Sequence, residues 1–170
     1  MKGSILIDPK KCLGCKTCEL QCAIVHSKSK NLIKAICEKP LPQTRIRVEA
    51  AEDLSVPLQC RHCEDAPCVK ICPTKATVKS EPEGPVLIKD ELCIGCKWCV
   101  LVCPFGVIRI SREGAAVTKC DLCFERLEKG EFPACVAACP SKALQFKSIE
   151  ELSKDKRKEY LVIFKTKEAA

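Results

Sequence analysis

The sequence predicts a small α+β protein that is rich in loops and is held together by metal-bound cysteines more than by an apolar core. Seventeen of its 170 residues are cysteine, several times the frequency in ordinary globular proteins. Aromatic residues make up only 4% of the chain, with one Trp and one Tyr, so the large side chains that fill most cores are scarce. Short stretches rich in β-branched residues precede two groups of cysteines, which predicts small strands leading into cysteine-bearing loops.

Sixteen of the cysteines form four groups of four with regular spacing. The first and third groups read C-x2-C-x2-C-x3-C, the run with which bacterial ferredoxins bind iron–sulfur clusters. The second and fourth groups lengthen the gap between their second and third cysteines to four and eleven residues, and both end in x3-C-P. The groups are Cys12, Cys15, Cys18 and Cys22; Cys60, Cys63, Cys68 and Cys72; Cys93, Cys96, Cys99 and Cys103; Cys120, Cys123, Cys135 and Cys139; Cys37 stands alone.

This spacing has a physical reason. Three thiolates at positions i, i+3 and i+6 lie on one tight loop and can bind three irons of one cubane, while the fourth cysteine, on the short helix that follows, points to another cubane. A proline directly after the fourth cysteine, at Pro73, Pro104 and Pro140, fits a helix that ends there. Cys22 is followed by alanine instead, so this helix is expected to continue to His26. The four groups predict four 4Fe-4S clusters with the sixteen cysteines as ligands.

Two other uses of cysteine are weaker alternatives. A tetrahedral zinc site usually pairs two C-x2-C units across a longer loop and has no use for a fourth cysteine close behind the third. Disulfides need an oxidising compartment, and the cysteine count is odd. The N-terminus shows no signal-peptide pattern, so the expected localisation is cytoplasmic, where thiols stay reduced.

An internal repeat predicts the domain organisation. The segment Ile5–Lys16 aligns with Val86–Lys97, and both place a short strand before a glycine-bearing cysteine loop. The second and third groups read as one two-cluster ferredoxin-like module, and the first and fourth close around it with Ile5–Ile7 and Ala143–Phe146 as outer strands. We therefore expect tandem or nested bacterial two-cluster ferredoxin-like modules. The expected parts are an outer module of residues 1–35 and 113–147, a connecting segment 36–59, an inner module 60–112 and a C-terminal tail 148–170.

Exchange of the fourth cysteines between paired groups then assigns the ligands of each cluster. The rival pairing, of group one with two and of group three with four, stays open. The favoured sets are Cys60, Cys63 and Cys68 with Cys103; Cys93, Cys96 and Cys99 with Cys72; Cys12, Cys15 and Cys18 with Cys139; and Cys120, Cys123 and Cys135 with Cys22.

The remaining segments are expected to be small elements. Residues 36–59 contain three prolines around the alternating run Arg45–Glu49, which predicts a connection or a small hairpin. The tail has a charged, helix-like run, Ser148–Lys158, followed by the apolar stretch Tyr160–Phe164. A closing element is the favoured interpretation of the tail, and a partner contact is the alternative.

Net charge and hydropathy narrow the partner classes. The chain has 29 basic and 22 acidic residues, a formal charge of +7. Four oxidised clusters with their thiolates contribute about −2 each, which brings the total close to zero. The sequence has no platform of aromatic and basic residues for stacking bases, so no nucleic acid is expected. The longest apolar runs are far too short to cross a bilayer, so no membrane span is expected either.

The sequence resembles a known family, the four-cluster ferredoxin-like electron-transfer subunits that accompany molybdopterin oxidoreductases, hydrogenases and carbon monoxide dehydrogenase. The resemblance covers about residues 3–147. Within the family, the segment Cys22–Leu32 and the short length are similar to the iron–sulfur subunit of carbon monoxide dehydrogenase. The motifs that carry the family resemblance are Gln59–Cys68, Lys119–Cys123 and Pro133–Pro140.

The resemblance implies an anaerobic electron-transfer subunit with no catalytic residues. Its partners would be a catalytic redox enzyme, with carbon monoxide dehydrogenase first and formate dehydrogenase or hydrogenase as alternatives, and a second electron carrier or flavoprotein. A free polyferredoxin is a further alternative. Some relatives replace a cysteine of the third group by Trp and hold a three-iron cluster, but here Trp98 stands beside an intact Cys99, so four 4Fe-4S clusters are expected.

A few other residues could act near the clusters. Lys16 and Lys97 each follow a second cysteine, and together with Trp98 they are candidates for tuning cluster potentials. His26 and His62 are interpreted as structural, although His62 lies between two ligands and could donate to a sulfide. Cys37 is expected to be a free thiol. An enzyme acting alone and a regulatory or zinc module are the competing function classes.

Overall fold

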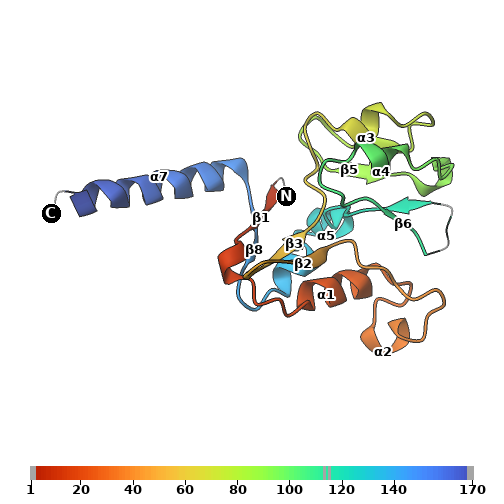
Figure 1. The fold of residues 1–170 in the computed structure, drawn as a ribbon, viewed down its shortest axis with the longest axis horizontal. Coiled ribbons are helices and arrows are strands. Elements are labelled where there is room, and N and C mark those ends of the chain that lie inside the picture. The colour runs from red at the N-terminus through yellow and green to blue at the C-terminus, as the bar shows by residue number, and fades with distance from the viewer. Residues whose placement is uncertain (1–2, 113, 115, 168–170) are drawn as a thin grey trace.

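Antiparallel two-stranded ladders joined by loops and short helices make up the fold (Figure 1). The computed structural model describes residues 3–112, 114 and 116–167. The first ladder pairs β1 (Ser4–Ile7) with β8 (Leu144–Lys147), and Ile5 lies opposite Phe146. It brings the two ends of the cysteine-bearing region together, which confirms the outer strands expected from the sequence.

Two short ladders support the second and third cysteine groups in the upper part of Figure 1. The strand expected at Val86–Ile88 is present as β5 and pairs with β4 (Thr77–Lys79). A second ladder, of β6 (Arg109–Ile110) and β7 (Val117–Thr118), was not expected. Helices α3 (Pro67–Lys70) and α4 (Trp98–Val102) contact each other here. The 3-10 turn η2 (Asp90–Leu92) leads from β5 into the third group.

Short helices carry the first and fourth cysteine groups in the lower part of the molecule. Helix α1 (Thr17–Val25) packs against α6 (Ala134–Ala137), so the first and fourth groups meet. Helix α1 ends with His26 as its C-cap, as expected from the missing proline after Cys22. The remaining elements of this part are η1 (Pro9–Lys11), α2 (Leu32–Ala35) and α5 (Phe124–Glu128).

The connecting segment forms a hairpin of β2 (Arg47–Ala51) and β3 (Leu54–Leu58). Its alternation is that of a half-buried strand, because Ile46 and Val48 are buried while Arg47 and Glu49 are exposed. The strand begins at Arg47 and not at Arg45 as expected. The reason is that the backbone N–H of Arg45 donates to Cys22 Sγ at 3.2 Å.

Cysteine side chains supply much of the buried core, which falls into three parts. The lower core joins the hairpin, β1 and β8 to the first and fourth cysteine groups, the upper core joins β5 to the second and third groups, and the bridging core lies between them. The lower core comprises Ile5, Cys18, Cys22, Ile46, Val48, Leu122, Leu127, Cys135 and Leu144; the upper core Ala66, Cys68, Val86, Cys99, Ile108 and Val117; the bridging core Cys60, Val107 and Cys120.

The tail differs from the expected closing element. Helix α7 (Ile149–Lys167) joins the charged run and the apolar stretch in one continuous helix that extends away from the body (Figure 1). Lys147 Nζ lies 2.7 Å from Asp155 Oδ2, which ties the start of the helix to β8. Leu161 and Val162 remain 60% and 59% exposed, so this part of the helix does not cover the core. No helix in the described ranges has the length and apolar character needed to cross a bilayer.

Candidate iron–sulfur centres

The structure brings the cysteines of different groups together in the combinations expected from fourth-cysteine exchange. One small cavity in the upper part is lined by four cysteines, which we call quartet A, and a second cavity is lined by four others, quartet B. In each, one cysteine comes from the partner group. Quartet A is Cys72, Cys93, Cys96 and Cys99; quartet B is Cys60, Cys63, Cys68 and Cys103.

The lower part shows the same exchange between the first and fourth groups. Besides burial, the charges of Cys12 and Cys139 raise the pKa of Cys18, and the charge of Cys22 raises those of Cys120, Cys123 and Cys135. We call the set that contains Cys22 quartet C and the set that contains Cys139 quartet D. Their role as ligands, like that of quartets A and B, stays a prediction. Quartet C is Cys22, Cys120, Cys123 and Cys135; quartet D is Cys12, Cys15, Cys18 and Cys139.

Left-handed backbone positions turn the cysteine loops inward. Gly14 and Gly95 have φ of 65° and 68°, and the lysines that follow Cys15 and Cys96 also lie in this region. A Cβ at Gly14 would stand 2.8 Å from Ser55 Oγ, so a side chain would have to displace this hydroxyl and would be strained at this positive φ. Successive left- and right-handed residues point N–H groups into one concavity, which suits sulfur acceptors. In the second and fourth groups His62 and Leu122 are left-handed as well, and their backbone N–H groups donate to Cys60 Sγ and Cys120 Sγ, both at 3.4 Å.

The burial of the sulfur atoms favours a bound metal. Burial raises the pKa of Cys18, Cys68 and Cys123 to about 11, and it also raises the pKa of Cys120 and Cys135. Neighbouring cysteines add to the effect, since thiolates crowded together repel one another. All seventeen cysteines are free, so no disulfide relieves the crowding. A cation that replaces the thiol protons would do so, and all-cysteine donor sets of this kind fit 4Fe-4S clusters.

The candidates Lys16 and Lys97 lie at the starts of two helices, α1 and α4, and their effect on cluster potentials stays a prediction. Their side chains are exposed, and the backbone of each forms the left-handed N-cap of the helix that carries the third cysteine, with φ of 57° and 65°. Their conformation therefore shapes the loop, while their ammonium groups face solvent. Trp98 is 55% exposed and lies at the surface as well. Cys37 is an exposed free thiol, as expected.

His62 is held inside the upper part. Its Nδ1 accepts a hydrogen bond from Val86 N–H at 3.0 Å, which leaves the proton on Nε2. Burial and the charge of Lys119 lower the pKa of His62 to about 3, so the ring is neutral. Within the described residues, Nε2 is buried and has no hydrogen-bond partner. Nδ1 therefore has the structural role expected for His62, whereas Nε2–H is a donor without a partner among the described residues.

A buried lysine that the sequence interpretation missed joins the two parts of the molecule. Lys119 is 4% exposed, and its Nζ donates to the carbonyl oxygens of Val86 and Cys120. Val86 belongs to β5 in the upper part, while Cys120 belongs to quartet C in the lower part. The ammonium group also lowers the pKa of Cys68 in quartet B, against the larger opposing effect of burial. In the sequence, Lys119 could have been noticed from its position directly before the first cysteine of the fourth group.

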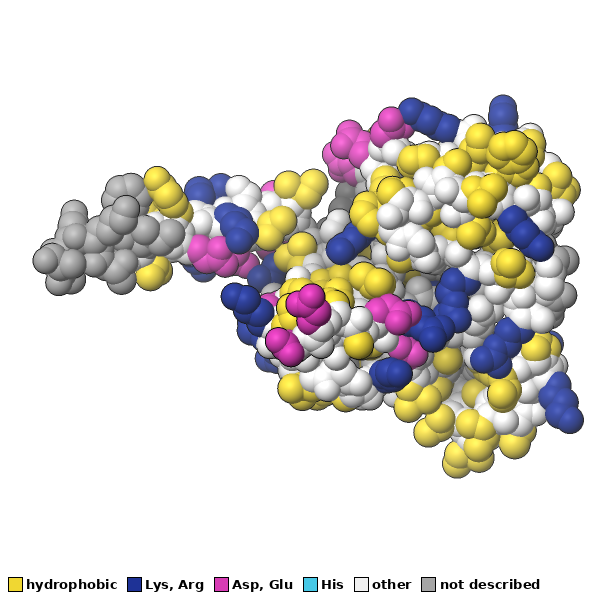
Figure 2. All heavy atoms as spheres, in the orientation of Figure 1, with side chains coloured by type: hydrophobic (Ala, Val, Ile, Leu, Met, Phe, Trp, Pro, Cys, Tyr) yellow, Lys and Arg dark blue, Asp and Glu magenta, His cyan; other side chains and the backbone are white. Residues whose placement is uncertain are grey.

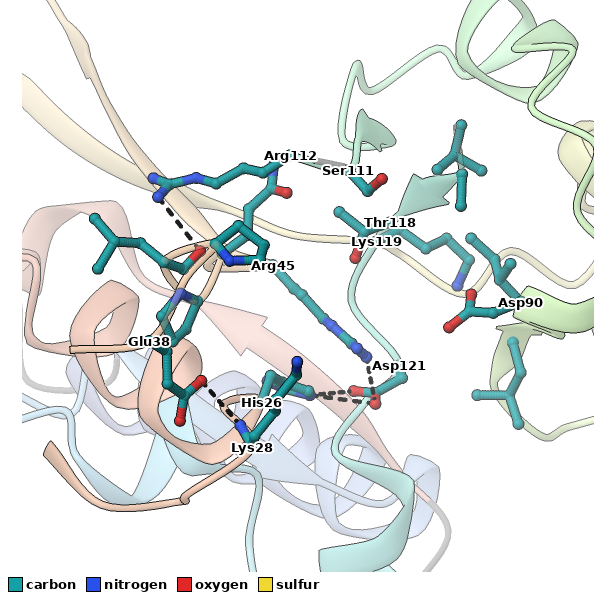
Figure 3. Close-up of a pocket in the computed structure, with 18 of the residues that line it drawn as sticks. His26, Lys28, Glu38, Arg45, Asp90, Ser111, Arg112, Thr118, Lys119 and Asp121 are labelled. Atoms are coloured by element: carbon teal, nitrogen blue, oxygen red, sulfur yellow. Dashed lines mark hydrogen bonds and ion pairs between the residues drawn. The ribbon is translucent and has the colours of Figure 1, made fainter. Parts of the chain in front are cut away.

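A polar cavity of about 540 Å³ separates the upper and lower parts on one side (Figure 3). The charged groups on its wall largely bind one another or the backbone. Arg45 Nη1 lies 2.6 Å from Asp121 Oδ2, and Arg112 Nη1 donates to Leu41 O at 3.3 Å. Glu38 accepts from the backbone N–H of Lys28 at 3.1 Å. This wall therefore fits a structural role better than a catalytic one.

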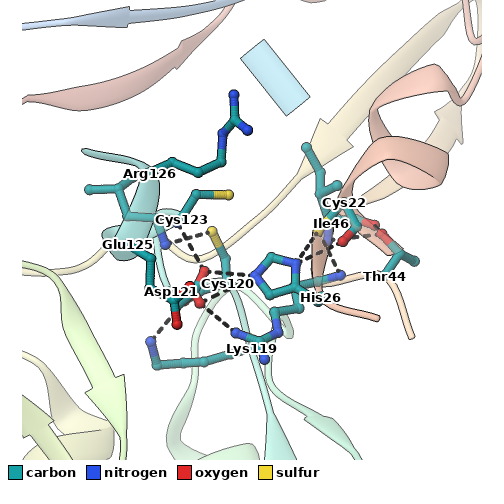
Figure 4. A network of polar contacts seen from close by, with 12 residues as sticks. Cys22, His26, Thr44, Ile46, Lys119, Cys120, Asp121, Cys123, Glu125 and Arg126 are labelled. Carbon is teal, nitrogen blue, oxygen red and sulfur yellow. Dashed lines mark hydrogen bonds and ion pairs between the residues drawn. The ribbon is translucent and has the colours of Figure 1, made fainter. Parts of the chain in front are cut away.

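His26, Arg45 and Asp121 form a polar network, seen in Figure 3, and Figure 4 shows His26 and Asp121 beside the cysteines of quartet C. Burial by itself would raise the pKa of Asp121, but the hydrogen bond from His26 and the charges of His26 and Arg45 hold that pKa well below its usual range. Burial would lower the pKa of His26, but its bonds to Asp121 and Cys22 raise it to about 9. The purely structural interpretation of His26 was therefore incomplete, and Arg45 and Asp121 were missed. Asp121 stands between two cysteines of one group, which was the only sequence signal.

Comparison with known proteins agrees with the cysteine geometry. A family model described as a 4Fe-4S dicluster domain matches residues 51–149. An "Iron-sulfur protein" of Rhodospirillum rubrum is 42% identical over 164 residues, covering 88% of this chain and 85% of the relative. "Electron transport protein HydN" of Escherichia coli (strain K12) is 40% identical, covering 96% of this chain and 100% of the relative. The B subunit of the anaerobic dimethyl sulfoxide reductase of the same strain is 36% identical, covering 87% and 74%.

These names support an iron–sulfur electron-transport protein. They do not single out carbon monoxide dehydrogenase, so the expected similarity to the iron–sulfur subunit of that enzyme is not supported. The relatives are electron-transport proteins and a subunit of an oxidoreductase. The family model covers more than half of the chain, and the relatives align over most of it. This chain therefore belongs to the 4Fe-4S dicluster domain family.

Proposed function

We propose that the chain is an electron-transfer subunit that holds four 4Fe-4S clusters and relays single electrons between a catalytic oxidoreductase and a second redox partner. Quartets A to D would hold one cluster each. Each bound cluster supplies a one-electron redox centre whose potential depends on burial, charge and hydrogen bonds to sulfur. The observation that carries the proposal is the continuous order of the four quartets through the protein.

The three core parts connect the quartets in a line. Cysteines of quartets A and B pack together in the upper core, and cysteines of quartets C and D pack together in the lower core. Cys60 of quartet B and Cys120 of quartet C meet in the bridging core. The resulting order is A, B, C, D. Neighbouring quartets therefore share buried contacts, as a relay needs.

The two ends of this line reach the surface. Cys96 of quartet A and Cys15 of quartet D are exposed, whereas Cys60 and Cys120 in the middle are buried. Apolar side chains surround the quartet A end, where Ile94 is 67% and Leu101 is 81% exposed. Figure 2 shows hydrophobic side chains gathered over the region of α3 and α4. Exposed apolar patches of this kind mark protein contacts, which fits partner exchange at an end of the relay.

The proposal also concerns which enzyme is the catalytic partner. The likeness of the segment Cys22–Leu32 to the iron–sulfur subunit of carbon monoxide dehydrogenase favours that enzyme, while a formate dehydrogenase or hydrogenase keeps the same role. A free polyferredoxin is the remaining form of the proposal. Anaerobic affinity purification of the native chain, with mass spectrometry of the bound proteins and assays of carbon monoxide, formate and hydrogen oxidation, separates these forms.

Metal analysis of the anaerobically purified chain tests the cluster content. We expect a brown protein with about sixteen irons and sixteen labile sulfides, because sixteen cysteines can hold four 4Fe-4S clusters. Cys37→Ser is the matched control, since it removes the cysteine that stands outside the four groups and should leave the iron content unchanged. A colourless protein that contains zinc would contradict the proposal.

A further inference from the structure

An apolar groove lies between α1 and α2 on the surface of the lower part. Its volume is about 170 Å³, and Arg112 is the only polar side chain among the described residues that line it. Three of the lining side chains, Leu20, Leu32 and Ile36, are 48%, 46% and 63% exposed. Figure 2 shows hydrophobic side chains gathered over the region of α2, at the lower right of the view. Exposed apolar surface of this kind marks a contact site.

Hydrogen bonds hold the walls of the groove in place. The carboxylate of Glu38, which follows α2, accepts from the backbone N–H groups of Lys28 and Ser29, which follow α1, at 3.1 and 2.8 Å. The third wall is fixed by Arg112, whose Nη1 donates to Leu41 O at 3.3 Å. The groove is therefore formed before anything binds, and a preformed site loses little free energy to ordering when it binds a partner.

The rim of the groove is basic. The segment 28–42 contains four lysines and one glutamate, and the arginine of the lining adds a further cation. The glutamate already binds backbone N–H groups, and Lys30 pairs with Glu125 at 3.3 Å. Lys34 and Lys39 are exposed. An apolar floor with a positive rim is complementary to an apolar surface that is bordered by acidic side chains.

The C-terminal helix of a second copy is a poor match to this rim. Helix α7 extends away from the body and exposes apolar side chains such as Leu161, so it is the apolar segment that this chain itself could offer to a neighbouring copy. Its charged residues, however, are six basic and four acidic. A positive helix against a positive rim is disfavoured, because like charges brought together repel. The charges therefore favour a different protein as the occupant.

Helix α1 places the groove close to the buried cysteines. Cys18 and Cys22 pack in the lower core, while Leu20 and Ile24 of the same helix line the groove. One helix, about 10 Å across, therefore separates a protein bound in the groove from these two sulfur atoms. The groove lies beside the end of the line of quartets at which Cys15 is exposed. This position suits a protein that exchanges electrons with that end.

We propose that the groove between α1 and α2 docks an amphipathic helix of a redox partner, with apolar side chains in the groove and acidic side chains against the lysines of the rim. The inference deepens the proposed function, on which it rests, by stating the chemistry of the partner's surface. An amphipathic helix fits because its apolar side chains form one stripe that a hydrophobic groove can receive. The opposite charges speed association at low salt and set the orientation of the partner.

Two synthetic peptides test the proposal on the anaerobic holoprotein. Each is a fluorescein-labelled amphipathic helix of about eighteen residues, long enough to form a helix. Both carry leucine on one face, and the polar face carries glutamate in one peptide and lysine in the other. In fluorescence anisotropy the glutamate peptide should bind at least about tenfold more tightly, and added salt should narrow the difference. Equal affinities, or no binding of the glutamate peptide, would overturn the proposal.

Matched variants locate the bound peptide. Ile36→Asp places a carboxylate in the groove and should weaken binding of the glutamate peptide about tenfold or more. Ile149→Asp is its control, since Ile149 is 73% exposed but lies at the start of α7. Lys34→Glu combined with Lys39→Glu should weaken binding at low salt and much less at high salt, whereas Lys158→Glu on α7 should change nothing. Unchanged binding to Ile36→Asp, or an equal loss in Ile149→Asp, contradicts the assignment to the groove.

Other occupants and a failed proposed function give different results. A dimer in light scattering that Ile36→Asp dissociates would assign the groove to a second copy and overturn the proposal. In the anaerobic affinity purification, the redox enzyme bound by the unsubstituted chain should be lost from Ile36→Asp and kept by Ile149→Asp, and its retention by both would also overturn it. An unsubstituted chain without iron refutes the proposed function, whereas an iron-replete chain that binds both peptides equally refutes only this inference.

Discussion

Removal of iron is expected to unfold the cysteine-bearing body of the protein, residues 3–147. Cysteines make up a third or more of each core part, and among the described residues the largest fully buried side chains are Ile46, Val86 and two prolines. Helices α3 and α6 have four residues each, too few to be stable without tertiary contacts. Metal binding and folding are coupled in small domains of this kind. Anaerobic chelation followed by amide hydrogen exchange should show loss of protection across the body.

The C-terminal helix provides an internal comparison in the same experiment. Helix α7 has 19 residues, and its side chains between Ser153 and Val162 are mostly exposed, so its contacts with the cores are few. Its hydrogen-exchange protection should therefore change little on chelation. Retention of protection in β1 and β8 without iron would show that the apolar side chains suffice, and would contradict the prediction.

Replacement of a fourth cysteine is expected to damage the cluster of the partner group and to spare the cluster of its own group. Cys139→Ala should remove or convert the cluster of quartet D, because Cys139 and Cys12 both lie close enough to Cys18 to affect its pKa. The cluster of quartet C should remain. Iron analysis and electron paramagnetic resonance of the anaerobic holoprotein measure the result, with a loss of up to about four irons. Cys37→Ser is again the control.

Double variants make the assignment sharper. If Cys139 and Cys15 serve one cluster, Cys15→Ala combined with Cys139→Ala should lose no more iron than the more damaging single variant. Cys139→Ala combined with Cys123→Ala should lose the irons of two clusters, because these two cysteines then serve different clusters. The reverse pattern, with additive loss in the first double variant, would show that each group holds its own cluster.

Local spacing explains which parts of the fold were predictable. Residues three apart on a tight loop are close together whatever the rest of the chain does, so the C-x2-C-x2-C runs of the first and third groups directly indicated three members of a quartet. The strands at Ile5–Ile7 and Val86–Ile88 were also predictable, because each leads directly into such a loop. The direction of the tail was not, since its helical pattern says nothing about what it packs against.

The sequence by itself determined that cysteines in four sets dominate this protein, because their spacing is a local property of the chain. Only the tertiary structure decided the linear order of the quartets and the network at Asp121. Arg45 and His26 are separated from Asp121 by 76 and 95 residues. They meet because α1 packs on α6 and β1 pairs with β8, and contacts across such separations depend on the packing of the whole chain. The network beside quartet C is therefore a property of the fold and not of the motif.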